Sequence, residues 1–140
     1  MHGKKDKNTH ILVLAKGEEV VASLLSYCRE NSIYSASISG LGALSRARLA
    51  LYDLSSKTYS RKDLISALEL IVLNGNISKL KDEVTAHLHV ALSDAEMNAF
   101  GGHLDSATVA ATCEIIITEL PVKITRKHDN DIGLNLIERG

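Results

Sequence analysis

The chain has almost no aromatic residues, and this limits how its core can be built. It holds no Trp, four Tyr and one Phe, so aromatics make up 4% of its 140 residues. Hydrophobic residues still make up 45% of the chain, so Leu, Ile, Val and Ala must form the interior. The single proline, Pro121, leaves few forced breaks in the backbone. The length is typical of one domain.

Cysteine is scarce, and long apolar runs are missing. Cys28 and Cys113 lie far apart and form no motif. We expect both to be buried small hydrophobic residues rather than a disulfide. No stretch reaches the roughly 20 apolar residues of a membrane-spanning helix, and the polar residues 1–8 do not resemble a signal peptide. These absences predict a cytoplasmic protein.

The chain also has no excess of positive charge. Its 16 basic and 17 acidic residues give a net charge of −1. A field of the whole protein that attracts nucleic acid is therefore excluded, and such binding would need a local basic patch. Candidate nucleic-acid contacts are Arg46, Arg48 and Lys123, the last near Arg126 and Lys127. The alternative for each is ordinary solvated surface charge.

Hydrophobic periodicity predicts an α+β fold. Residues 18–31 have helical spacing, with an apolar stripe from Val20 to Cys28. Because helices do not alternate with strands, a mostly antiparallel sheet of about seven or eight strands is favoured over a doubly wound parallel one. Residues 1–8 are expected to be a flexible N-terminus and 9–140 a single domain. Strand patterns cover residues 10–15, 33–44, 46–53, 58–61, 64–73, 84–92, 99–104 and 107–120, with weaker ones at 123–126 and 132–136.

The strand over residues 33–44 ends in Gly40-Leu41-Gly42. A Gly-x-Gly after a strand can bind phosphate. However, Ser45 stands where the third glycine of that fingerprint belongs, and no convincing helix follows. A bulge or tight turn is therefore favoured.

Three of the six histidines lie between residues 87 and 103. His87 and His89 are two apart, so on a strand they point to the same face, roughly 6–7 Å apart. His103 follows Gly101 and Gly102, which allow a close backbone approach. Three converging imidazoles would suit zinc with a fourth position open. The alternative is that the pair consists of hydrogen-bonded strand residues and that His103 lies in a loop.

Several motifs, in order, resemble the PPC domain (Plants and Prokaryotes domain). The resemblance covers about residues 10–119. The motifs are Ser39-Gly40-Leu41-Gly42-Ala43-Leu44, Leu51-Tyr52-Asp53, Leu68-Glu69-Leu70, Leu73-Asn74-Gly75-Asn76-Ile77-Ser78, His87-Leu88-His89, Gly101-Gly102-His103-Leu104 and Thr112-Cys113-Glu114-Ile115. One departure is Lys81-Asp82-Glu83, where the family usually has Asp-Gly.

The resemblance implies an antiparallel α+β fold, a homotrimer and a zinc site at His87, His89 and His103. Prokaryotic members are often labelled predicted DNA-binding proteins, and plant members carry an Arg-Gly-Arg-Pro AT-hook that this chain lacks. In plant members the region matching Ala67 to Val72 contacts other regulators. We also expect a pocket lined by Glu69, Asn74, Asn76, Gly101 and Gly102.

Three functions remain open on the sequence. The first is a homotrimeric, non-enzymatic binding module, with itself, a regulatory protein or DNA as partner. The second is a metal-dependent enzyme that uses zinc-bound water on a small molecule, with Glu69 or Glu114 as general base. The third is DNA binding by the bare domain through its basic residues. No complete catalytic constellation is evident, so the module is favoured.

Overall fold

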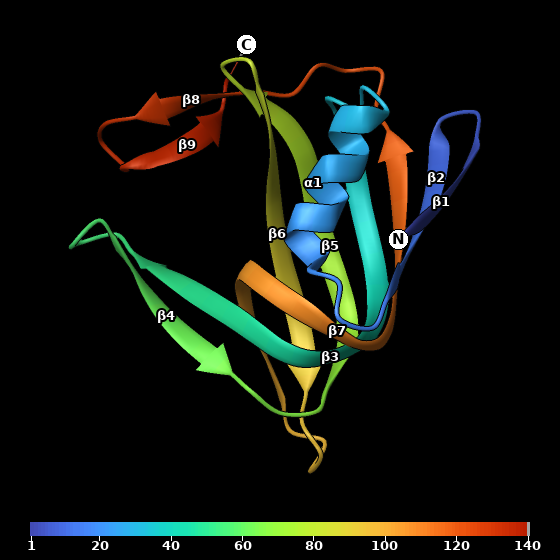
Figure 1. Cartoon of the computed structure of the whole chain (residues 1–140). Coiled ribbons are helices and arrows are strands. Elements are labelled where there is room, and N and C mark those ends of the chain that lie inside the picture. The colour runs from blue at the N-terminus through green and yellow to red at the C-terminus, as the bar shows by residue number, and fades with distance from the viewer. Residues whose placement is uncertain (140) are drawn as a thin grey trace.

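The computed structural model describes residues 1–139, which form one α-helix and nine strands (Figure 1). The strands are β1 (His2–Asp6), β2 (Thr9–Ala15), β3 (Ala36–Asp53), β4 (Thr58–Leu64), β5 (Leu68–Leu80), β6 (Glu83–Ser93), β7 (Ala99–Glu119), β8 (Thr125–Asp129) and β9 (Leu134–Ile137), and helix α1 covers Val20–Glu30. Every strand pair is antiparallel except β5 with β8. The predicted α+β class is confirmed.

Helix α1 begins where Glu19 caps it. One Glu19 carboxylate oxygen accepts a hydrogen bond from the Ala22 amide, and the other accepts one from the Ala107 amide of β7 at 2.8 Å. The same side chain therefore caps the helix and ties it to the sheet. The apolar stripe buries Val20, Leu24 and Cys28, and Asn31 forms the C-cap. The helix is slightly shorter than the predicted 18–31. Glu19 and Asn31 are its caps, and Glu18 precedes the N-cap.

Replacing Glu19 with alanine should destabilise the protein. Loss of an N-cap costs about 0.5–2 kcal/mol, and the Ala107 amide would also lose its acceptor. We expect an unfolding free energy lower by about 2 kcal/mol in chemical denaturation. Glu30→Ala is the matched control, because Glu30 only accepts a hydrogen bond from the Ser26 hydroxyl at the exposed end of the helix. Equal losses in both variants would reject this role for Glu19.

Four strands close on one another around the core. β3 pairs with β5, β5 with β6, β6 with β7, and β7 with β3, while β1 and β2 extend the sheet beyond β7. Helix α1 lies across one face (Figure 1). Alternate residues such as Leu12, Ile115 and Ile117 are fully buried on that side. The interior is aliphatic, as the scarcity of aromatic residues predicted.

Two hairpins project from this body. β3 and β4 form one, and β8 and β9 form the other (Figure 1). They are joined near their tips, where the Tyr52 hydroxyl donates to the Ile132 carbonyl at 2.7 Å and the Lys57 ammonium donates to the Asn130 carbonyl at 2.9 Å. The hairpins therefore frame the part of β6 and β7 that lies between them.

Two local predictions hold in the structure. The pairing of β3 with β5 shifts register between Gly40 and Gly42, which confirms the bulge. Cys28 and Cys113 are buried free thiols, and burial raises the pKa of Cys28 to about 12 and that of Cys113 to about 11. Both thiols therefore stay protonated and act as apolar core residues.

The N-terminal residues differ from the expectation of a flexible segment. His2–Asp6 forms β1, which pairs with β2 in the register Lys4 to Ile11. All five of its residues are exposed, so no apolar alternation marks it as a strand. It is held by backbone hydrogen bonds to the free edge of β2. Strand β1 adds one strand, whereas the predicted strands 33–44 and 46–53 form the single strand β3, and 99–104 and 107–120 form the single strand β7.

Candidate metal centre

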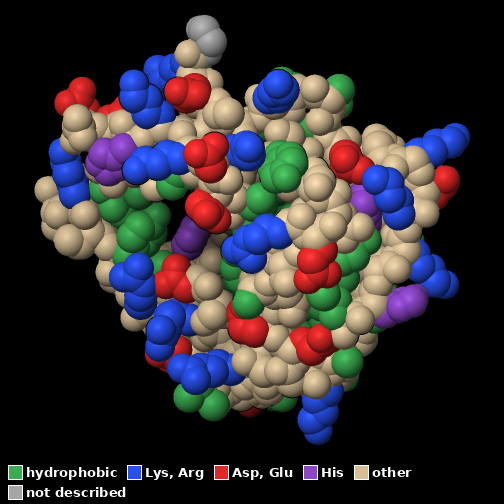
Figure 2. Space-filling model, turned by 45° about the horizontal axis from the view of Figure 1, so that its top comes forward, with side chains coloured by type: hydrophobic (Ala, Val, Ile, Leu, Met, Phe, Trp, Pro, Cys, Tyr) green, Lys and Arg blue, Asp and Glu red, His purple; other side chains and the backbone are tan. Residues whose placement is uncertain are grey.

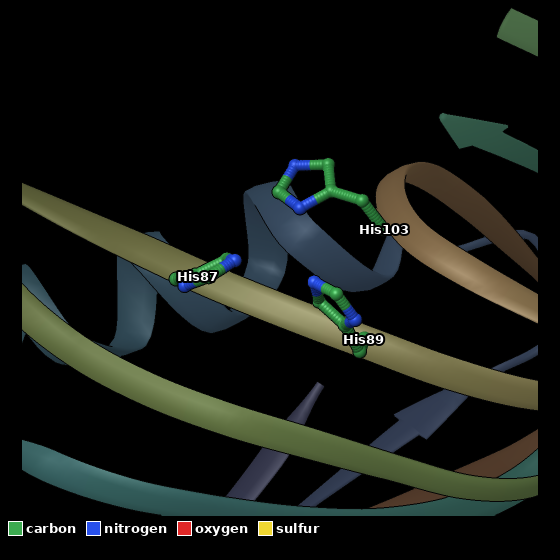
Figure 3. A group of neighbouring side chains, drawn as sticks. All are labelled: His87, His89 and His103. Carbon is green, nitrogen blue, oxygen red and sulfur yellow. The ribbon is translucent and has the colours of Figure 1, made fainter. Parts of the chain in front are cut away.

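His87, His89 and His103 converge on one point (Figure 3). His87 and His89 stand on β6, and His103 stands on β7 directly opposite His89 in the ladder. Each ring offers one nitrogen, and the three nitrogens lie within 4.8 Å of one another. The ring centroids are 5.1–5.6 Å apart. A pair on one strand and a single histidine on its neighbour thus form a three-imidazole cluster.

Strand alternation and two glycines place the cluster. Leu88 and Val90 are buried on the inner face of β6, so His87 and His89 point outward. Beneath them, a side chain on Gly75 of β5 would stand 2.0 Å from the His87 carbonyl oxygen. On β7, a side chain on Gly101 would stand 2.3 Å from the Val90 carbonyl oxygen. These positions need glycine because neighbouring backbones pass too close for a Cβ.

Two of the imidazoles are held in the form that binds metals. Burial and, to a smaller extent, the nearby Arg126 charge together lower the pKa of His87 to about 4. Burial also lowers the pKa of His103, although Asp105 opposes this effect. Both rings are therefore neutral at pH 7, as a metal ligand must be. Three converging imidazoles suit zinc or a similar transition metal, with one coordination position left for water or a ligand.

Asp105 is the carboxylate beside the cluster. Its Oδ1 lies 3.8 Å from His103 Nε2, and its Oδ2 accepts a hydrogen bond from Arg61 at 2.6 Å. The Tyr59 ring lies 5.7 Å from the His103 ring and packs under the Arg61 guanidinium. Such a carboxylate can orient a ligating histidine. Sequence reasoning missed Asp105, although its i+2 spacing from His103 repeats the spacing of the His87–His89 pair.

Arg126 of β8 reaches the other side of the cluster. Its Nη2 lies 3.5 Å from His87 Nδ1 and donates to Asn76 Oδ1 at 2.9 Å. The sequence placed Arg126 only in a basic stretch, because the pairing of β8 with β5 is not visible in a single sequence. Together with the β8–β9 hairpin it borders a cavity of about 330 Å³. Figure 2 shows a hollow with histidine side chains at its rim.

The expected pocket residues divide into two groups. Asn74 and Asn76 pair with His89 and His87 in the ladder, and Gly101 and Gly102 directly precede His103. Glu69 instead pairs with Ser93, at an exposed position apart from the cluster. Glu114, the other proposed general base, pairs with Val13 and Leu41. Neither acid shares a ladder position with a histidine.

The candidate nucleic-acid contacts do not form one patch. Arg46 and Arg48 both pair with Asp63 of β4, at 3.1 and 2.9 Å. Lys123 lies next to Ile124, whose amide donates to Ser35, just before the start of β3. Arg46 stands farther along β3, opposite Thr108. The two arginines therefore share one aspartate, and Lys123 is remote from them.

The fold and the motifs define a protein family. Residues 1–121 match the model of the Plants and Prokaryotes Conserved (PCC) domain, the family that the motifs resemble. The chain belongs to this family. Arg126 and the β8–β9 hairpin lie after the matched segment.

Solved structures of similar proteins share the fold of this chain over nearly its whole length. A proposed DNA-binding protein from Bacteroides thetaiotaomicron is 31% identical, with a TM-score of 0.95 over 98% of this chain and 96% of its own. Another from Ralstonia eutropha is 29% identical, with a TM-score of 0.91 over 99% and 96%. A metal-containing protein from Archaeoglobus fulgidus is 32% identical, with a TM-score of 0.87 over 99% and 97%.

A curated relative is much longer. The bifunctional protein GlmU of a Synechococcus strain is 30% identical over 125 residues, which cover 87% of this chain and 19% of that protein. The chain thus spans about a fifth of the curated relatives it matches. Within residues 1–139, no helix is both long enough and apolar enough to cross a membrane.

Proposed function

We propose that this protein is a homotrimeric binding module that holds one zinc ion at His87, His89 and His103. The observation that carries the proposal is the convergence of three ligand nitrogens within 4.8 Å. The neutral state of His87 and His103 supports it. The similar protein from Archaeoglobus fulgidus, which contains a metal, also supports it. Bound zinc would supply a positive charge and an open coordination position at the cavity.

Exposed apolar residues support self-association. On the sheet face opposite α1, Ile11, Leu41 and Ile116 are each about half exposed. Ile71 and Val72 are also exposed, in the region that matches the contact segment of plant members. Contiguous apolar surface of this kind marks interaction sites. The buried free thiols fit a reducing compartment, which supports our placement of the protein in the cytoplasm.

Metal analysis and mass together test the proposal. Protein purified without added metal should carry about one zinc per chain in elemental analysis. Sedimentation equilibrium should give a mass of about 46 kDa, three times the chain mass of 15.2 kDa. Trace metal in freshly purified protein would reject the metal site. A mass of one chain at micromolar concentration would reject the trimer.

DNA is a further candidate partner, because two similar solved proteins are proposed DNA-binding proteins. The net charge and the pairing of Arg46 and Arg48 with Asp63 weigh against it. If the domain neutralises phosphates, its affinity for a duplex must fall steeply as salt is raised. Fluorescence anisotropy at several salt concentrations measures that slope, and a flat response rejects this partner.

A metal-dependent enzyme is the second candidate function, favoured by the cavity beside the cluster. Water bound to zinc has a pKa near 7 and can act as a nucleophile. A general base would have to stand close by. Asp105 lies nearer than Glu69 or Glu114, but it is held by Arg61. The binding module is therefore the better supported function.

A further inference from the structure

The guanidinium of Arg126 is held by neutral groups alone. It donates to the Ser78 hydroxyl at 2.8 Å, to the Asn76 side chain at 2.9 Å and to the Asn135 carbonyl at 2.9 Å. Within residues 1–139, no carboxylate lies within ion-pairing distance of it. By contrast, Arg46, Arg48 and Arg61 each pair with an aspartate.

This cation is also partly withdrawn from water. The Arg126 side chain is half-buried. The guanidinium nevertheless stays charged at pH 7. A desolvated charge is costly unless an opposite charge compensates it. A metal ion beside His87 would add further positive charge to the same place.

Arg126 and the histidines share one cavity. The cavity of about 330 Å³ is bordered by His87, His103 and Arg126, with Leu80, Leu134 and Leu136 as apolar wall. This volume is at the small end of small-molecule sites. The arrangement is a concave apolar site with a few convergent polar groups, and every charged group that borders it is cationic or an imidazole.

We propose that the cavity binds a small oxyanion, a carboxylate or a phosphate group, between Arg126 and the metal position of the three histidines. One anionic oxygen takes the open coordination position, and the planar guanidinium donates to another oxygen of the same group. The inference rests on the metal site of the proposed function and names the class of ligand that this site takes. The β8–β9 hairpin, which carries Arg126, then selects the ligand.

The competing explanation is that Arg126 only anchors the hairpin. Its hydrogen bonds do connect β8 to β5 and β9. An anchor would affect stability, but it would not distinguish an anion from a neutral molecule of the same shape. The test therefore compares anion affinity with loading of the metal and with stability.

The full chain loaded with Co²⁺ provides a direct readout, because the visible absorption of Co²⁺ reports its ligands. The probes are acetate, inorganic phosphate and acetamide, which is the neutral isostere of acetate. The variants are Arg126→Gln, Arg126→Lys and, as a control, Lys127→Gln. Lys127 is the next residue on β8, is exposed and does not border the cavity with the histidines.

We expect acetate or phosphate, but not acetamide, to change the cobalt spectrum of the unmodified protein. The oxyanion that binds with the higher affinity identifies the ligand class. Arg126→Gln should show the same spectrum without anion and bind the anion about 10- to 100-fold more weakly, as expected for a lost charge-assisted hydrogen bond. Arg126→Lys keeps the positive charge but loses the planar set of guanidinium donors, so its affinity for the anion should be intermediate. Lys127→Gln should bind like the unmodified protein.

The outcomes separate the two claims. Absence of cobalt bands in the unmodified protein would reject the metal site, and this inference with it. Cobalt bands with equal anion affinity in Arg126→Gln would overturn the inference alone. If Arg126→Gln does not fold, Arg126→Lys provides the comparison. If neither variant folds, equal responses of the unmodified protein to acetate and acetamide would overturn it.

Discussion

Replacing His87 and His89 together with alanine should leave the protein with only trace metal. The two residues supply two of the three ligand nitrogens, and His103 alone cannot hold a zinc ion against the solvent. Both side chains project from the outer face of β6, so the core beneath them stays intact. We expect elemental analysis to fall from about one zinc per chain to background, while circular dichroism remains that of the unmodified protein.

The control for this experiment removes an imidazole elsewhere. His2→Ala deletes an exposed histidine of β1 that is not a member of the cluster and does not border the cavity. This variant should keep its metal in full. Retention of metal by His87→Ala with His89→Ala, or loss in the control, would mean that the metal is held somewhere else.

Replacing Gly75 with alanine should be the most destabilising of the substitutions considered. The new Cβ would stand 2.0 Å from the His87 carbonyl oxygen and 2.9 Å from a methyl group of Leu88. Because the nearest atom belongs to the backbone of β6, relief requires the two strands to separate. Overpacking in a core costs about 1–3 kcal/mol, and a backbone clash belongs at or above the upper end. We expect a loss of about 3 kcal/mol in urea denaturation.

Gly102→Ala is the matched comparison on β7, the other strand that pairs with β6. A Cβ there would stand 3.2 Å from the Ala50 carbonyl oxygen, a contact that small adjustments can relieve. It should cost clearly less than Gly75→Ala. Since Gly75 lies beneath the histidine pair, its substitution should also weaken metal binding. A Gly75→Ala protein as stable as Gly102→Ala would show that close strand approach does not explain this glycine.

The sequence predicted best what local patterns determine. The apolar stripe of residues 18–31 identified the helix, and the two-residue spacing of His87 and His89 placed them on one face of a strand. Gly101 and Gly102 pointed to a close approach before His103, and β6 and β7 do meet there. The bulge at Gly40 and Gly42 followed from the missing third glycine of the phosphate-binding fingerprint.

Features that depend on distant pairing were missed. Strand β1 has no apolar face, so only the free edge of β2 makes it a strand. Arg126 reaches His87 because β8 lies parallel to the end of β5, a long-range pairing with no local signal. Glu69 was expected to line the pocket. A register shift between Leu70 and Val72 and the length of the strand set it apart from the histidines.

The central claim is that one metal ion sits among three imidazoles from β6 and β7. X-ray diffraction at the zinc absorption edge, from crystals of protein purified without added metal, tests this most directly. We predict one anomalous peak per chain, with bonds of about 2.0–2.1 Å to nitrogens of His87, His89 and His103. An anomalous peak bound by other residues, or no peak among these three rings, would contradict the account.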